Sequence, residues 1–132
     1  MKSFKTFSGI AAPLIRVNID TDAIIPSREI KTVSKKGLSG GLFAEWRYLS
    51  LESRKENPDF ILNQDPFKKA SILVTGNNFG CGSSREHAVW ALSEWGIRAI
   101  IAPSYGSIFY SNCIKNGILP IVMDGRVISS MS

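Results

Sequence analysis

The chain has 132 residues, of which 44% are hydrophobic and 20% charged, the balance of an ordinary globular protein with one core. No apolar run is long enough to cross a membrane, and the N-terminal region lacks the apolar core of a secretory signal, so we expect a cytoplasmic protein. The net charge of +5 favours an anionic partner, which leaves nucleic acid, small dicarboxylates and acidic protein surfaces as candidates.

The N-terminal part predicts short extended runs at residues 3–10 and 13–19, which Gly9 and Pro13 separate. The following Asp20-Thr21-Asp22 is typical of a polar turn in which aspartate side chains accept hydrogen bonds from neighbouring N–H groups. The chain therefore begins with short elements joined by turns.

Residues 31–41 contain three lysines, two serines and three glycines, which predicts a mobile basic loop. The aromatic residues that follow, within 42–51, are expected in the core or at an interface instead of around a cofactor. Residues 52–70 are polar and contain two Pro-centred turns, which we expect to flank a short helix.

From residue 71 the pattern becomes regular, and it predicts a βαβαβ unit with strands at 71–75, 97–102 and 118–122 and helices at 84–95 and 105–116. Gly96 and Gly117 follow the two helices at the position where a left-handed residue ends a helix. The order predicts parallel strands with right-handed crossovers. Ligands of such sheets bind outside the carboxyl ends of the strands.

A glycine-rich turn, residues 76–82, joins the first of these strands to its helix and leads into Ser83, Ser84 and Arg85. Its glycines permit positive φ angles, and its backbone N–H groups, together with the helix N-terminus, favour an anion. Arg85 offers a fork that fits a carboxylate or phosphate. Ser83 and Glu86 also form a capping box, so the spacing alone leaves a purely structural role open. Neither a Walker loop nor a dinucleotide fingerprint fits this segment.

The two cysteines, Cys81 and Cys113, lie far apart without the spacing of a metal site, and we expect free thiols. A nucleophilic Cys81 is disfavoured because no base pattern accompanies it. The only histidine, His87, has no second histidine at zinc-binding spacing. We expect it to be structural and hydrogen-bonded near the start of its helix.

The segment Gly80-Cys81-Gly82-Ser83-Ser84-Arg85-Glu86-His87 resembles the active-site turn of the mobile domain of aconitase-type dehydratases, a family that includes the small subunits of isopropylmalate isomerases. Further blocks at 18–26, 37–48 and 107–120 resemble the same family and keep its order. The resemblance implies an α/β fold, a three-layer β/β/α swivelling domain with the βαβαβ unit in its C-terminal half. It implies one domain over residues 1–132, without the C-terminal extension usual in the family.

The resemblance further implies a hydro-lyase subunit that interconverts 2- and 3-isopropylmalate by dehydration and rehydration in leucine biosynthesis. By the matched motif, Ser83 is the catalytic base, acting as an alkoxide. Ser84 and Arg85 bind substrate carboxylates, and Arg28 is a weaker candidate for the same work. Three further residues are expected to support the active site: Asp22, Gly80 and Gly82.

In this family the electrophile is a [4Fe–4S] cluster, which needs cysteine thiolates. Two distant cysteines cannot hold one, so the resemblance implies no cofactor on this chain and a cluster on a large subunit, with which the chain forms a heterodimer. The loop at 31–41 is implied to close over the variable group of a small dicarboxylate substrate.

Two alternatives stay open. The first is a small subunit of a citramalate- or homoaconitate-type hydro-lyase, a choice that the loop at 31–41 would decide. The second, from another class, is an anion- or nucleic-acid-binding module. Scattered lysines and the lack of a base-stacking motif count against nucleic acid, so neither nucleic acid nor membrane is the expected partner.

Overall fold

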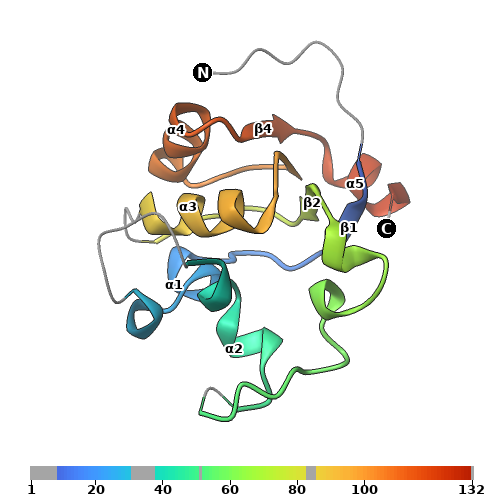
Figure 1. The fold of residues 1–132 in the computed structure, drawn as a ribbon. Coiled ribbons are helices and arrows are strands. Elements are labelled where there is room, and N and C mark those ends of the chain that lie inside the picture. The colour runs from blue at the N-terminus through green and yellow to red at the C-terminus, as the bar shows by residue number, and fades with distance from the viewer. Residues whose placement is uncertain (1–8, 31–37, 51, 83–85, 132) are drawn as a thin grey trace.

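A computed structural model describes residues 9–30, 38–50, 52–82 and 86–131. Its centre is one four-stranded sheet with the strand order β1-β2-β3-β4, in which every neighbouring pair is parallel (Figure 1). The strands are β1 (Ala11–Leu14), β2 (Ile72–Thr75), β3 (Ala99–Ala102) and β4 (Leu119–Val122). Each connection leads to the next strand along the sheet, always towards the same edge. Right-handed connections in this order all lie on one face of the sheet.

Five α-helices are described: α1 (Thr21–Ile24), α2 (Ala44–Arg47), α3 (Glu86–Trp95), α4 (Ser107–Lys115) and α5 (Gly125–Met131). The predicted α/β class and βαβαβ unit, which runs from β2 through α3, β3 and α4 to β4, are confirmed, with boundaries one or two residues inside the predicted ones. The beginning predicted for the first helix, at residues 84 and 85, lies outside the described residues. The second β layer of the expected three-layer arrangement is not among the described residues, which form this single sheet.

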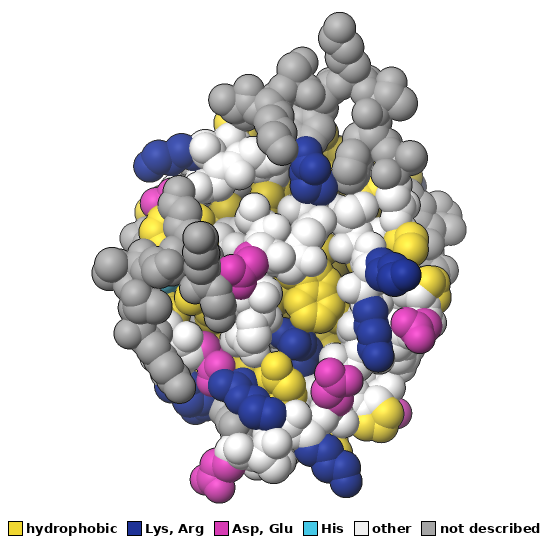
Figure 2. All heavy atoms as spheres, viewed as in Figure 1, with side chains coloured by type: hydrophobic (Ala, Val, Ile, Leu, Met, Phe, Trp, Pro, Cys, Tyr) yellow, Lys and Arg dark blue, Asp and Glu magenta, His cyan; other side chains and the backbone are white. Residues whose placement is uncertain are grey.

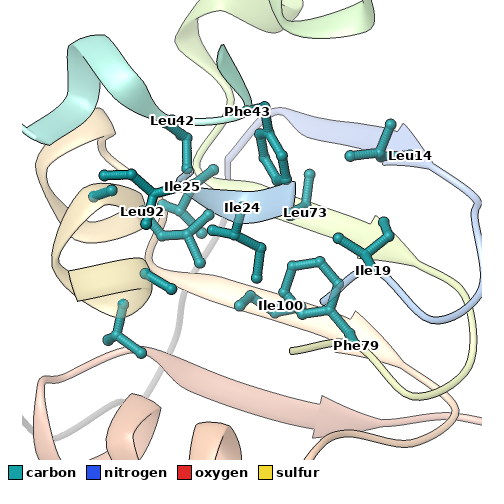
Figure 3. Close-up of a cluster of buried hydrophobic side chains, with 14 of the residues drawn as sticks. Leu14, Ile19, Ile24, Ile25, Leu42, Phe43, Leu73, Phe79, Leu92 and Ile100 are labelled. Atoms are coloured by element: carbon teal, nitrogen blue, oxygen red, sulfur yellow. The ribbon is translucent and has the colours of Figure 1, made fainter. Parts of the chain in front are cut away.

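Successive side chains of a strand point to opposite faces of the sheet, and both faces of this sheet carry buried side chains. Leu73 and Ile100 point into the main core together with buried residues of α1, α3 and α4. Figure 3 shows Ile24, Phe43 and Leu92 pointing towards those two residues. On the opposite face a smaller cluster is formed by Val74, Ile101 and Ile128, the last of which comes from α5.

The segment before β2 differs from the prediction in three places. Pro13 lies inside β1 instead of separating two runs. This is possible because β1 is an edge strand, so the missing N–H of proline does not interrupt a central ladder. Residues 52–70 contain two 3-10 helices, Ile61–Asn63 and Phe67–Lys69, where one short helix was expected. Of the basic loop, 31–37 lies outside the described residues, and Leu38–Gly41 forms a 3-10 helix.

Glycine ends both helices of the βαβαβ unit, as predicted. Gly96 has a φ of +118° and Gly117 a φ of +82°, both in the left-handed region. The N–H of Ile97 donates to the carbonyl of Leu92, which is the long closing bond of a glycine helix end. These turns direct the chain back into the sheet after each helix.

Arg47 is a buried cation that ties the segment before β2 to α3. Its Nη1 donates to the carbonyl oxygens of Ser39 (2.7 Å) and Leu42 (2.9 Å), and its Nη2 donates to the hydroxyl of Tyr48 (3.1 Å). The guanidinium also lies 4.5 Å from the ring centroid of Trp95 in α3. Burial lowers the pKa of Arg47 from its ordinary value.

We expect Arg47→Lys to lower the free energy of unfolding by about 1–3 kcal/mol, because lysine lacks the second nitrogen that bonds Tyr48 and the planar group that stacks on Trp95. Urea denaturation of the isolated chain measures the change. Arg126→Lys is the matched control, since the side chain of Arg126 is 97% exposed. We expect that control to stay within about 0.5 kcal/mol of wild type. Equal effects of the two substitutions would contradict a structural role for Arg47.

Candidate functional site

The glycine turn, residues 76–82, leaves β2 at its carboxyl end and lies between the segments that follow β1 and β3. Two isolated parallel bridges extend the sheet into it, one between Asp20 and Cys81 and one between Phe79 and Tyr105. The turn is therefore held from both sides at the edge of the sheet where ligands of parallel α/β proteins bind.

Four backbone hydrogen bonds fasten the turn to the segment after β1, and in the first of them the N–H of Gly76 donates to the carbonyl of Arg16 (3.2 Å). The N–H of Asn18 donates to the carbonyl of Asn77 (2.8 Å), and the N–H of Gly80 donates to the carbonyl of Ile19 (2.7 Å). The N–H of Thr21 donates to the carbonyl of Cys81 (2.9 Å). These bonds satisfy turn groups that would otherwise need water.

On the other side, the segment after β3 makes the matching contacts. The N–H of Phe79 donates to the carbonyl of Ser104 (3.1 Å), and the N–H of Gly106 donates to the carbonyl of Phe79 (2.9 Å). The ring of Phe79 also packs edge-on against Phe109 of α4, with ring centroids 5.3 Å apart. With contacts on both sides, the backbone from 77 to 81 has a defined path.

Three glycines of the turn are required by this packing. A Cβ on Gly76 would lie 2.6 Å from the carbonyl oxygen of Arg16. Gly80 has a φ of +77°, and a Cβ there would collide with the ring of Phe109. Gly82 has a φ of +94°, and a Cβ there would lie 3.3 Å from the Cβ of Asp20. Gly106 makes the approach possible from the other side, because a Cβ on it would lie 2.6 Å from the carbonyl oxygen of Gly80. The sequence predicted Gly80 and Gly82 as supporting residues but gave no signal for Gly106.

The two aspartates beside the turn differ in what they do. Asp20 is the N-cap of α1, where its Oδ1 accepts a hydrogen bond from the N–H of Ala23 (2.7 Å). The predicted aspartate turn chemistry is thus confirmed for Asp20, which also lies against Gly82. Asp22 is exposed in the first turn of α1, and its supporting role at the site stays a prediction.

Three of the predicted site residues, Ser83, Ser84 and Arg85, lie outside the described residues. The chain is described up to Gly82 and again from Glu86, the first residue of α3 as described. Glu86 is fixed towards α4, since its Oε2 accepts a hydrogen bond from Nδ2 of Asn116 (2.8 Å). The roles assigned to these three residues remain predictions.

Arg28 lies in the 3-10 helix Ser27–Glu29, away from the hydrogen bonds that hold the turn. Its Nη2 donates to Oε2 of Glu45 in α2 at 3.0 Å, and its side chain is 55% exposed. Such an exposed pair contributes little to stability, so Arg28 could exchange Glu45 for another carboxylate at small cost.

The ring of His87 packs edge-on against Trp90, with centroids 4.8 Å apart. Among the described residues, its Nε2 atom is buried without a hydrogen-bond partner. The structural role expected for His87, with a hydrogen bond near the start of its helix, stays a prediction.

Both cysteines are free thiols, as predicted. Burial raises the pKa of Cys113 to about 12, so this thiol stays protonated and is a poor metal ligand. Across the described ranges no group of three or more His, Cys, Asp or Glu side chains could hold a metal ion. These residues do not fit an iron–sulfur cluster.

The charges on the visible face are mixed. Figure 2 shows Lys and Arg side chains interspersed with Asp and Glu and with apolar patches. A nucleic-acid-binding surface concentrates its positive charge along one stripe, which this face does not. Within the described parts of the chain, no helix has the length and apolarity to cross a membrane.

The fold and the site together define a parallel α/β domain that presents a glycine turn at the carboxyl edge of its sheet. The family model described as the aconitase C-terminal domain matches residues 1–126, and the chain belongs to that family.

Relatives and one solved structure agree with this assignment. The chain is 58% identical over 132 residues to a 3-isopropylmalate dehydratase small subunit from Cupriavidus necator, covering all of this chain and 64% of that protein. It is 59% identical over 123 residues to the protein of the same name from Rhodospirillum rubrum, covering 93% of this chain and 58% of the relative. A crystal structure of 3-isopropylmalate dehydratase from Methanocaldococcus jannaschii has a TM-score of 0.66 and 35% identity, over 89% of this chain and 62% of that one. The chain thus spans about three fifths of the length of the proteins it matches.

Proposed function

We propose that this chain acts in the small subunit of a 3-isopropylmalate dehydratase, a hydro-lyase that interconverts 2- and 3-isopropylmalate in leucine biosynthesis. The observation that carries the proposal is the glycine turn, held on both sides at the carboxyl edge of the sheet and leading directly into Ser83-Ser84-Arg85. The names of the relatives and of the solved structure support the choice of reaction.

In this proposal Ser83 removes a proton from an unactivated carbon of the substrate. A serine can do this only as an alkoxide, which needs strong electrostatic stabilisation near neutral pH. A backbone held on both sides supports that role, because preorganised groups stabilise developing charge most effectively, and in this proposal the guanidinium of Arg85 adds a positive charge. Gly80 and Gly82 let the backbone pass close to its neighbours, and Asp22 supports the site from α1.

Substrate binding falls to the neighbouring residues. Ser84 donates a hydrogen bond to a carboxylate oxygen, and Arg85 binds a carboxylate through two parallel N–H groups. Arg28 is the weaker candidate for the second carboxylate, since it already pairs with a carboxylate on the protein surface. A small dicarboxylate has two such groups to hold, which agrees with this division of work.

The partner in this proposal is a large subunit that holds a [4Fe–4S] cluster, and the two chains form a heterodimer in the cytoplasm. When bound there, the cluster supplies an open iron as the Lewis acid for the leaving hydroxyl. The present chain supplies the base and the carboxylate clamps, and it holds no cluster of its own. The division explains why a chain with one half-buried and one buried thiol can serve an iron–sulfur enzyme.

We expect Arg85→Lys to raise KM for isopropylmalate with little change in melting temperature. Lysine keeps the positive charge but loses the fork that binds both carboxylate oxygens. Steady-state kinetics of the enzyme assembled with the large subunit measure the effect, and Arg126→Lys on the exposed surface is the control. An unchanged KM would contradict a carboxylate clamp at this position.

The proposed function is tested by mixing the full-length protein with a cluster-loaded large subunit and following the loss of 2-isopropylmalate. We expect turnover in the mixture and none with either chain alone. Citramalate and homoaconitate are assayed in parallel. A clear preference for either acid would make that acid the proposed substrate in place of isopropylmalate. Turnover of none of the three acids would overturn the proposal. Iron analysis of the isolated chain should find no stoichiometric cluster.

A further inference from the structure

Side chains from the segments after β1, β2 and β3 meet in one small polar network on the surface beside the glycine turn. The N–H of Asn78 donates to Oγ of Ser104 (2.8 Å), and Nδ2 of Asn78 donates to Oδ1 of Asn18 (3.1 Å). The N–H of Asn18 in turn donates to the carbonyl of Asn77 (2.8 Å). We call this set, Asn18, Asn78 and Ser104, the asparagine staple. It links the three segments that surround the turn.

The staple requires unusual backbone conformations. Asn18 has a φ of +55° and Asn78 a φ of +60°, both in the left-handed region. Asparagine tolerates this region better than most residues with a side chain, although the conformation still costs free energy. All three residues of the staple are exposed, so water competes for each of its hydrogen bonds and the net gain in stability is small. A contribution to global stability is therefore a weak explanation for the staple.

The position of the staple offers a better explanation. Asn78 lies at the near end of the turn, two residues before Gly80 and four before Gly82, the last described residue ahead of Ser83. Its bonds to Asn18 and Ser104 hold the first half of the turn to both neighbouring segments. The backbone bond from Gly80 to the carbonyl of Ile19 then fixes the middle of the turn. The side chain of Asn78 is thus a link between the turn and Asn18 that a substitution can remove without removing a backbone hydrogen bond.

We propose that Asn78 is a positioning residue, which acts through Asn18 and Ser104 to set the path of the glycine turn and thereby the place of Ser83. This inference rests on the proposed function, in which Ser83 is the base. Asn78 does not contact the substrate in this proposal, and its effect on Ser83 passes through the backbone between the two residues. Small displacements of a reacting group can lower a rate by about a hundredfold.

The first experiment measures kcat, KM and melting temperature of the enzyme assembled from the full-length chain and its large subunit. We expect Asn78→Ala to lower kcat by roughly tenfold to a hundredfold with KM nearly unchanged, while alanine at a φ of +60° costs about 1 kcal/mol of stability. Asn18→Leu should behave in the same way, because it removes the acceptor for Nδ2. Asn18→Asp should retain most of the wild-type kcat, since a carboxylate accepts the same bond. The double variant Asn18→Leu/Asn78→Ala should lose no more than either single variant.

Two outcomes overturn the proposal. One is a loss of kcat that merely follows the loss of folded protein. The other is an Asn18→Asp variant as impaired as Asn18→Leu, because retention of the acceptor would then not matter.

The second experiment does not depend on catalysis: it measures the amide hydrogen exchange rates of the turn in the isolated chain. We expect Asn78→Ala to speed exchange at the bonded N–H groups of Phe79, Gly80 and Gly106 while the strands exchange as in wild type. If the wild-type enzyme shows no isopropylmalate turnover, the proposed function fails, and hydrogen exchange alone decides the positioning role. Unchanged exchange at Gly80 overturns that role whatever the activity.

Discussion

An enzyme assembled with the Ser83→Ala variant should lose between about two and four orders of magnitude in turnover rate, the range typical for loss of a general base. The Ser83→Asp variant separates this role from helix capping. Aspartate is as good an N-cap as serine, but it has no hydroxyl to become an alkoxide and brings a fixed negative charge to the anion site. If Ser83 is the base, both variants should therefore be nearly inactive.

If Ser83 only capped the helix, the two variants would differ. Ser83→Ala would lower the free energy of unfolding by about 1 kcal/mol, and Ser83→Asp would restore it. Activity would then follow stability, and the aspartate variant would turn over substrate. Urea denaturation beside the kinetic assay measures both quantities. Ser93→Ala, an exposed serine in α3, is the control and should match wild type in both.

Gly80→Ala should be among the most disruptive single substitutions in the domain. A Cβ at this position collides with the ring of Phe109, and its φ of +77° is strained for any residue with a side chain. Overpacking costs roughly 1–3 kcal/mol, and the left-handed conformation adds about 1 kcal/mol or more. We expect a loss of stability in that combined range, together with loss of activity because the turn must move.

Substitutions at two other glycines separate the two causes of this loss of stability, the collision and the backbone strain. Gly96→Ala has open space around the new Cβ but a φ of +118°, so it reports the backbone strain alone. Gly40→Ala has open space and no positive φ, and it should be nearly neutral. Urea denaturation of the three variants measures the series. A Gly80→Ala variant no less stable than Gly96→Ala would contradict the collision with Phe109.

The elements that could be predicted from the sequence are those whose signals are local. Continuous apolar runs indicated β2 and β3, since strands that are covered on both faces have no polar alternation. An apolar run also indicated β4, which is an edge strand and only partly buried. Gly96 and Gly117 marked the ends of α3 and α4 because a left-handed residue is needed there. The aromatic Phe43 was correctly expected in the core, where it is fully buried and stacks on Trp46.

The features that were missed depend on residues distant in sequence. Pro13 reads as a break in a run, and only the strand order reveals that it lies in an edge strand, where proline is tolerated. Gly106 carries no local sign that it faces Gly80, because that contact exists only after β3 has joined β2.

The hydrogen bonds of the asparagine staple also have a consequence for folding while the chain is being synthesised. Asn78 is 60 residues from Asn18 and 26 residues from Ser104 along the chain. Contacts between such distant residues form only after the intervening loops have closed. On a ribosome, Ser83 is therefore polymerised well before Ser104 and Gly106 exist to hold the turn that precedes it. We expect the nascent domain to pass through a stage in which Ser83, the proposed base, is already present but the turn before it has no fixed shape.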